Sequence, residues 1–403
     1  MILNFTGGAR PSKRSAFLEQ KINMIKTCSA VCIKAENGFE ISATVGAAVN
    51  RGTMLGFSGG MPIYAPIAGR FGGVIELEGA HYFAVMNRGE TGEERLCPPE
   101  IGAINEMTRD YIIETAKKFG IIDQRSGKPL FELLQEKEKF RRVVVDCTES
   151  DPLGCAAYRL CVEYPKEIVA GAKILIRATS ALKCVFAAEY NRDEIFEKFK
   201  PFTKDKKLFA LAELDEKYPY GDRALMDALY VKTLSLGETA SDRDVLIISP
   251  DAAFNLYLSM STGFPQTHLL VSYVGEGVSG GSFFVPRGMT MRDITVSLGN
   301  APTGCLLIEN DLLTGKPIKG VVSDGTRAII SIKPKKIKRS GCLSCGECVS
   351  ACPMRLYPFE ALGRNVKSMQ ESCIYCGACT YVCPSGIPLM ELIRNGGEKE
   401  GDR

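Results

Sequence analysis

The chain changes its hydrophobic pattern several times, and each change predicts a different kind of structure. Short apolar segments separated by glycines fill residues 36–88, as in FEISATVGAAV and MPIYAPIAGRFGGVIEL, which is typical of small β-sheets. From about residue 100 apolar residues recur at helical spacing, up to a stop at Gly120. These positions are Ile101, Ile104, Met107, Tyr111, Ile112 and Ala116.

The middle of the chain alternates compact apolar runs with helical segments. RRVVVDC, KCVFAAEY, KLFALAEL and DVLIIS are predicted to be buried strands with helices between them. This alternation predicts a mostly parallel sheet with helices on both faces and a ligand site at the carboxyl ends of its strands. The later stretch THLLVSYVGEGVSGGSFFVPRGMTMRDITVSL predicts two strands, a glycine-rich turn and a short helix.

These patterns predict a multidomain fold of the α/β plus β class. The predicted parts are an N-terminal arm at 1–35, a β domain at 36–99, an α/β domain at 100–262, a second β domain at 263–332 and a cysteine-rich α domain at 333–395. The basic segment KPKKIKRS at 333–340 has two interpretations. It is either a solvated linker or a charged segment that faces an acidic redox partner.

Charge and apolar content exclude several classes of function. A formal net charge of +3, with scattered basic residues, does not predict a nucleic-acid partner. No apolar run reaches the ~18 residues that span a bilayer. The segment MILNFTGGARPSKR lacks the apolar core of a signal peptide, and 16 cysteines fit a reducing compartment. We therefore expect a cytoplasmic protein that reaches a membrane only through partner subunits.

Half of the cysteines form two copies of one motif. CLSCGECVSACP and CIYCGACTYVCP both read C-x2-C-x2-C-x3-C-P, the run that binds two [4Fe–4S] clusters, with the fourth cysteine of each run ligating the other cluster. We call Cys342, Cys345, Cys348 and Cys383 the first quartet, and Cys352, Cys373, Cys376 and Cys379 the second quartet. Gly346 and Gly377 are expected to let main-chain N–H groups approach the cluster sulfurs.

The cysteines have other conceivable uses. Zinc would also suit paired C-x2-C motifs, but two identical registers ended by proline and without a nearby histidine favour clusters. Four further cysteines in the α/β region fit no metal-binding spacing, and they are interpreted as core residues, with a third metal site or a reactive thiol as the alternative. They are Cys147, Cys155, Cys161 and Cys184.

The order of domains resembles that of the RnfC family, a component of the Rnf-type electron transport complex. FTGGARPSK resembles the N-terminal element of that family, VGAAVNRG with APIAG its barrel-sandwich hybrid domain, and LLVSYVGEGV with FFVPRGMTMRDI its soluble-ligand-binding β-grasp domain. The resemblance implies an α/β domain like the flavin subunit of respiratory complex I, and a two-cluster ferredoxin-like domain. It also implies ferredoxin-like or flavoprotein redox partners and the other subunits of a membrane complex.

Two segments bear on flavin chemistry under this resemblance. The family has an E-x-E-P strand end beside FMN and NADH, and Glu149 and Asp151 of TESDPLG occupy the matching positions. A turn with a helix N-cap would explain them equally well. The family's glycine-rich loop is replaced by DQRSGKPLF, in which Gly127 and Lys128 are the candidate flavin-site residues. Asp123 would repel a phosphate, although Arg125 and Lys128 could supply compensating charge.

Two redox functions follow from the resemblance. In the first, the chain is an oxidoreductase subunit that passes electrons between NADH, through FMN, and its clusters. In the second, it is a one-electron relay for a reductase, of the type associated with proline reductase, and no longer binds NADH. Two [4Fe–4S] clusters are the expected cofactors, FMN is a candidate, and NADH binding in the manner of the family is not expected. No catalytic side chain is assigned.

Overall fold

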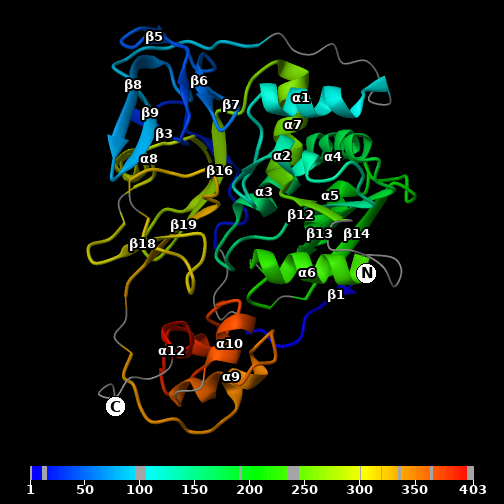
Figure 1. Ribbon diagram of the computed structural model, residues 1–403, viewed down its shortest axis with the longest axis vertical. Helices are drawn as coiled ribbons and strands as arrows, with labels where there is room; N and C mark the ends of the chain where they lie inside the picture. The colour runs from blue at the N-terminus through cyan, green and yellow to red at the C-terminus, as the bar shows by residue number, and fades with distance from the viewer. Residues whose placement is uncertain are drawn as a thin grey trace.

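The computed structural model describes residues 2–10, 16–96, 106–189, 193–215, 217–220, 222–234, 245–299, 301–318, 320–334, 337–363 and 366–396. Two β regions lie beside an α/β body, and the cysteine-rich region lies against one end of both (Figure 1). Within the described residues, no helix is both long and apolar enough to cross a membrane.

The α/β body is built on a five-stranded sheet in which all the strand pairs are parallel. Its order is β1 (Ile2–Leu3), β14 (Phe209–Leu214), β13 (Lys183–Glu189), β12 (Arg142–Asp146) and β15 (Val245–Ile248). The chain proceeds from β12 to one side and then returns to the other side at β15. The point where strand order reverses therefore lies between the carboxyl ends of β12 and β15, where ligands bind in open α/β sheets.

Helices cover both faces of this sheet, as the alternation predicted. One face carries α1 (Arg109–Lys118), α2 (Leu130–Gln135), α3 (Ala156–Glu163), α4 (Pro165–Thr179), α5 (Asp193–Phe199) and α7 (Pro250–Thr262), and the other carries α6 (Arg223–Leu234). Val143 and Val145 pack into the larger core and Val144 into the core beneath α6. A strand buried on both faces needs apolar residues at successive positions, which explains the run VVV.

The helix predicted from residue 100 begins at Arg109, because Thr108 caps it by accepting a hydrogen bond from the Tyr111 N–H. Ile101 and Ile104 lie outside the described residues. The short strands β10 (Ile122–Asp123) and β11 (Lys128–Pro129) form a hairpin that holds the segment DQRSGK beside β15.

The first β region contains two small sheets. One is β3 (Ala30–Ala35), β9 (Ala80–Met86), β8 (Gly69–Leu77) and β5 (Ala48–Val49), and the other is β4 (Glu40–Ile41), β6 (Met54–Ser58) and β7 (Met61–Tyr64). Residues 30–35, in the segment predicted as an arm, thus form a strand paired with β9. The barrel-sandwich assignment stays a prediction.

The second β region is one five-stranded sheet. Its order is β18 (Leu306–Glu309), β19 (Ala328–Ile332), β16 (His268–Gly275), β17 (Gly281–Pro286) and β2 (Asn23–Met24), with α8 (Met291–Leu298) packed on it. The β-grasp assignment also stays a prediction.

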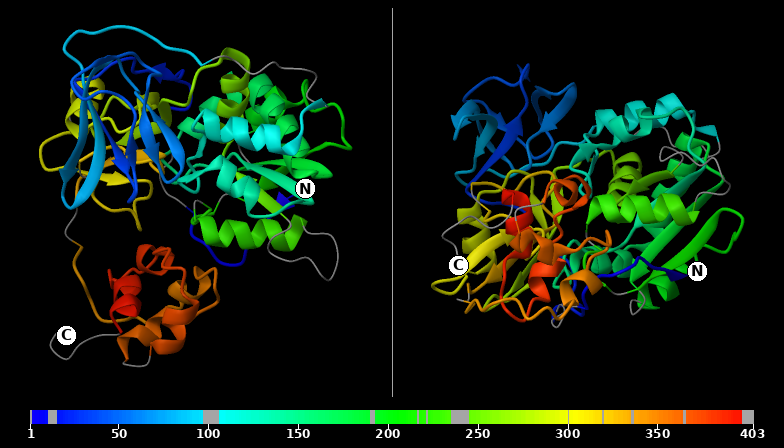
Figure 2. Two further views of the ribbon diagram at one scale, coloured as in Figure 1. Left: turned by 45° about the horizontal axis from the view of Figure 1, so that its top comes forward. Right: turned by 60° about the horizontal axis from the view of Figure 1, so that its bottom comes forward.

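The cysteine-rich region is a small helical unit. Its elements are α9 (Glu347–Ser350), the 3₁₀ helix η2 (Pro358–Leu362), α10 (Lys367–Ser372), α11 (Ala378–Tyr381) and α12 (Leu389–Asn395). The N-terminal segment passes between this unit and the α/β body (Figure 2).

Candidate redox centres

Each cysteine quartet lines its own cavity. Cys342, Cys345, Cys348 and Cys383 line one, together with Phe359 and Ile387. Cys352, Cys373, Cys376 and Cys379 line the other, together with Met390 and Ile393. The fourth cysteine of each sequence run therefore lies with the three cysteines of the other run, which is the arrangement that two [4Fe–4S] clusters require.

The two cysteine loops have the same backbone conformation. Ser344 and Tyr375 both have φ of 52°, and Gly346 and Gly377 have φ of 78° and 79°. Each glycine then caps a short helix, α9 or α11. The N–H groups of Ser344 and Tyr375 donate to the sulfurs of the cysteines two positions before them, at 3.4 and 3.3 Å. Such N–H donors stabilise negative charge on cluster sulfur.

Among the described side chains, no three of the Cys, His, Asp and Glu type gather around one position where a metal ion could bind. Burial raises the pKa of Cys376 and Cys379 to about 12. Bound iron would replace these protons, since a coordinating metal deprotonates a thiol.

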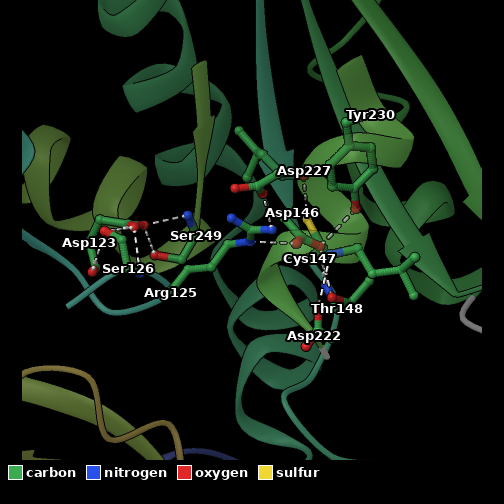
Figure 3. A network of polar contacts seen from close by, with 12 residues as sticks. Asp123, Arg125, Ser126, Asp146, Cys147, Thr148, Asp222, Asp227, Tyr230 and Ser249 are labelled. Atoms are coloured by element: carbon green, nitrogen blue, oxygen red, sulfur yellow. Dashed lines mark hydrogen bonds and ion pairs between the residues drawn. The ribbon is translucent and has the colours of Figure 1, made fainter. Parts of the chain in front are cut away.

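The point of strand reversal in the α/β sheet is occupied by side chains of the chain itself (Figure 3). The Arg125 guanidinium pairs with Asp146 at the end of β12, Nε to Oδ2 at 2.7 Å, and with Asp227 of α6, Nη2 to Oδ1 at 2.6 Å. The other Asp146 oxygen accepts from the Tyr230 hydroxyl at 3.0 Å and from Thr148. The positive charge of Arg125 is therefore already neutralised inside the protein.

Asp123 binds the main-chain donors of the same region. Its Oδ2 accepts from the N–H of Ser126 at 2.9 Å, and its Oδ1 accepts from the N–H of Ser249, just after β15, at 2.7 Å. Both serine hydroxyls donate to the same carboxylate. A carboxylate of the chain thus takes N–H groups that a phosphate could otherwise bind, and the described residues 123–128 do not fit a phosphate cradle.

The two carboxylates of TESDPLG make structural contacts. Glu149 accepts from the N–H of Tyr158 in the first turn of α3 at 2.9 Å, so it takes the capping role that the sequence offered as an alternative. Asp151 accepts from the N–H groups of Leu153 and Leu312 at 2.8 and 3.0 Å. Burial raises the pKa of Asp151 to about 6. Ser150, between them, has a buried hydroxyl without a hydrogen-bond partner, which a bound group could satisfy.

The remaining candidate residues lie elsewhere. Gly127 has a φ of 68° in the hairpin turn and faces Gly325, and the Lys128 ammonium pairs with Glu136, just after α2, at 3.5 Å on the surface. Cys147, Cys161 and Cys184 are fully buried in the core of the α/β body, and Cys155 is fully buried in a cluster with residues of β16 and β19. Sequence reasoning did not single out Asp146, Asp227 or Tyr230, and only the place of Asp146 at a strand end could have indicated it.

Comparison with known proteins accounts for both regions. Residues 127–257 match the family model described as the Nuo51 FMN-binding domain, and residues 334–384 match the 4Fe-4S dicluster domain. The chain is 25% identical over 342 residues to RnfC proteins of the ion-translocating oxidoreductase complex from Klebsiella pneumoniae (strain 342) and Salmonella arizonae. These alignments cover 79% of this chain and 45% and 50% of the two relatives.

The chain is an RnfC-like protein. It spans about half the length of the curated relatives it matches. The matching domains support the predictions of FMN and of [4Fe–4S] clusters as cofactors. The alignment with a solved structure of an NAD+-reducing [NiFe]-hydrogenase covers 73% of this chain and 61% of the hydrogenase chain. The sequence identity is 11% and the TM-score is 0.47.

Proposed function

We propose that this chain is an electron-transfer subunit of an oxidoreductase complex, in which each quartet binds one [4Fe–4S] cluster. The main support for this proposal is that each cavity is lined by one quartet. In each quartet, three cysteines come from one sequence motif and the fourth comes from the other motif. Such clusters exchange single electrons, so their partners are ferredoxin-like or flavoprotein carriers and the other subunits of a membrane-associated complex.

In the first form of this function, FMN in the α/β domain converts the two-electron chemistry of NADH into single electrons. The match of residues 127–257 to an FMN-binding domain supports it, as does the unsatisfied hydroxyl of Ser150. Residues 123–128 have no role in holding the flavin phosphate in this proposal, because they present a carboxylate where a phosphate would bind.

In the second form, the chain is a one-electron relay or docking protein that does not bind NADH. The contacts of Asp123 and Arg125 favour it, because both side chains are engaged within the protein at the point where a dinucleotide would bind. The chain would then receive single electrons from a partner protein.

Anaerobic purification followed by iron, sulfide and flavin analysis tests both forms. Either form requires about eight iron atoms per chain. Stoichiometric FMN and bleaching of the visible spectrum by NADH would establish the first form, and intact clusters without flavin and without reduction by NADH would establish the second. A colourless, iron-free protein, or one with zinc on these cysteines, would refute the proposed function as a whole.

A further inference from the structure

The surroundings of the two quartets differ. In the first quartet, Cys342 and Cys345 are exposed, and Leu343 between them is 67% exposed. In the second quartet, Cys376 and Cys379 are buried. The segment before the first quartet is held by hydrogen bonds from Ser340 N to Ser385 O at 3.0 Å and from the Ser385 hydroxyl to Gly341 O at 2.9 Å. The exposed face of the first quartet is therefore a fixed surface.

Tyr218 connects the second quartet to the α/β body. Its hydroxyl lies 2.6 Å from the main-chain oxygen of Cys376 and 3.1 Å from Oδ1 of Asp311. Its ring packs with Ala351 and Ala378 of the cysteine-rich region in one small apolar cluster. A side chain of the α/β body thus directly contacts the loop of a predicted cluster ligand.

The N-terminal segment completes the same junction. Gly8 donates its N–H to Ala351 O at 2.9 Å, and Ala9 exchanges two main-chain hydrogen bonds with Tyr218. A Cβ on Gly7 would lie 2.6 Å from the main-chain oxygen of Cys352. Tyr218 and the N-terminal segment therefore both pack tightly against the second quartet.

The junction continues to the segment TESDPLG. Asp311, which accepts from Tyr218, is followed by Leu312, whose N–H donates to Asp151 at 3.0 Å. The second quartet is thus connected through hydrogen-bonded groups to the segment that follows β12, whereas two cysteines of the first quartet, Cys342 and Cys345, are exposed.

We infer that Tyr218 is a positioning residue for the second-quartet cluster, which is the inner and less solvent-accessible member of the pair. The inference rests on the proposed function. The Tyr218 hydroxyl fixes the main chain of a cluster ligand and directs the positive end of its O–H dipole towards the second quartet, which favours the electron-rich state of that cluster. The same hydroxyl proton is shared with Oδ1 of Asp311, at the longer distance of 3.1 Å.

The first experiment is a redox titration of the anaerobically purified, full-length holoprotein, followed by electron paramagnetic resonance. Cys345→Ser and Cys376→Ser assign the signals to the two quartets. In Tyr218→Phe we expect only the second-quartet cluster to become harder to reduce. The ratio of reduced second-quartet cluster to reduced first-quartet cluster should fall about two- to tenfold, which is the range for the loss of one hydrogen bond. Tyr357→Phe also removes a tyrosine hydroxyl, at a 55% exposed site of the cysteine-rich region, and should shift neither potential.

The second experiment measures the solvent access of each cluster with a soluble dysprosium chelate, which speeds the relaxation of nearby spins. We expect a strong effect on the first-quartet signal and a weak effect on the second. Equal relaxation of both signals, or equal shifts in Tyr218→Phe and Tyr357→Phe, would overturn the inference although the clusters are present. Absence of iron would instead refute the proposed function.

Discussion

The α carbon of Gly7 lies against the main-chain carbonyl of Cys352, so closely that a Cβ there would be 2.6 Å from the oxygen. Gly7 also has a φ of 73°, in the left-handed region that side chains disfavour. This glycine belongs to one end of the chain and the cysteine to the other. The contact therefore makes docking of the cysteine-rich region dependent on a residue far away in sequence.

Gly7→Ala should loosen that docking. The new methyl group must push the Cys352 backbone away, so we expect faster protease cleavage in the linker at 333–341. Gly38→Ala is the matched control, because Gly38 has a φ of 80° but no atom within 4 Å of the added Cβ. If the two variants are cleaved at the same rate, the contact does not hold the domain in place.

Arg125→Met should strongly destabilise the α/β body. It leaves the buried carboxylate of Asp146 without its ion partner, a change that typically costs about 3–5 kcal/mol. The measurement is guanidinium unfolding followed by tyrosine fluorescence, since the chain has no tryptophan. Arg10→Met removes a side chain that is 72% exposed and pairs with Asp215 at 3.6 Å, and it should cost less than about 1 kcal/mol.

Asp251 should make the stability of this body depend on pH. Burial raises the pKa of Asp251 to about 7, and the nearby Asp123 adds to this shift. The unfolded chain releases the same proton near pH 4, so the folded state binds more protons between about pH 4 and 7 and loses stability as the pH rises through that window. Asp251→Asn does not titrate.

We therefore expect wild type to lose stability relative to Asp251→Asn between about pH 5.5 and 7, and the difference to stay constant from about pH 7.5 to 8.5. Unfolding by guanidinium at each pH measures it. Asp205→Asn, at an exposed position, should follow the wild-type profile. Parallel profiles for wild type and Asp251→Asn would contradict the shift.

Cys376→Ser and Cys161→Ser should separate cluster ligands from core thiols. The first should lower the iron content from about eight towards about four atoms per chain, because one of two clusters loses a ligand. The second replaces a fully buried thiol in the α/β core and should leave the iron content unchanged. An equal loss of iron in both variants would mean that the α/β cysteines also bind metal.

Local patterns were sufficient for much of the fold. The run VVV predicted a buried strand because both faces of β12 are covered, and the repeated cysteine spacing predicted two loops that adopt the same φ values. The contacts of the candidate site were harder to predict from the sequence. Arg125 and Asp227 are 102 residues apart, and Tyr218 and Cys376 are 158 apart. No local periodicity reports such pairs, so the sequence indicated an altered loop at 123–128 without indicating what fills it.

The pairing of β1 with β14 has a consequence for how the protein is made. During synthesis, Ile2 and Leu3 can join the sheet only after Phe209–Leu214, the strand that they pair with, has been translated. Phe209–Leu214 precedes Cys342, the earliest cysteine of the quartets, so the strand that holds this segment is complete before the first cluster ligand is made. Every segment of the α/β body that the cysteine-rich region packs against is thus translated before the cysteines that are to receive iron and sulfide.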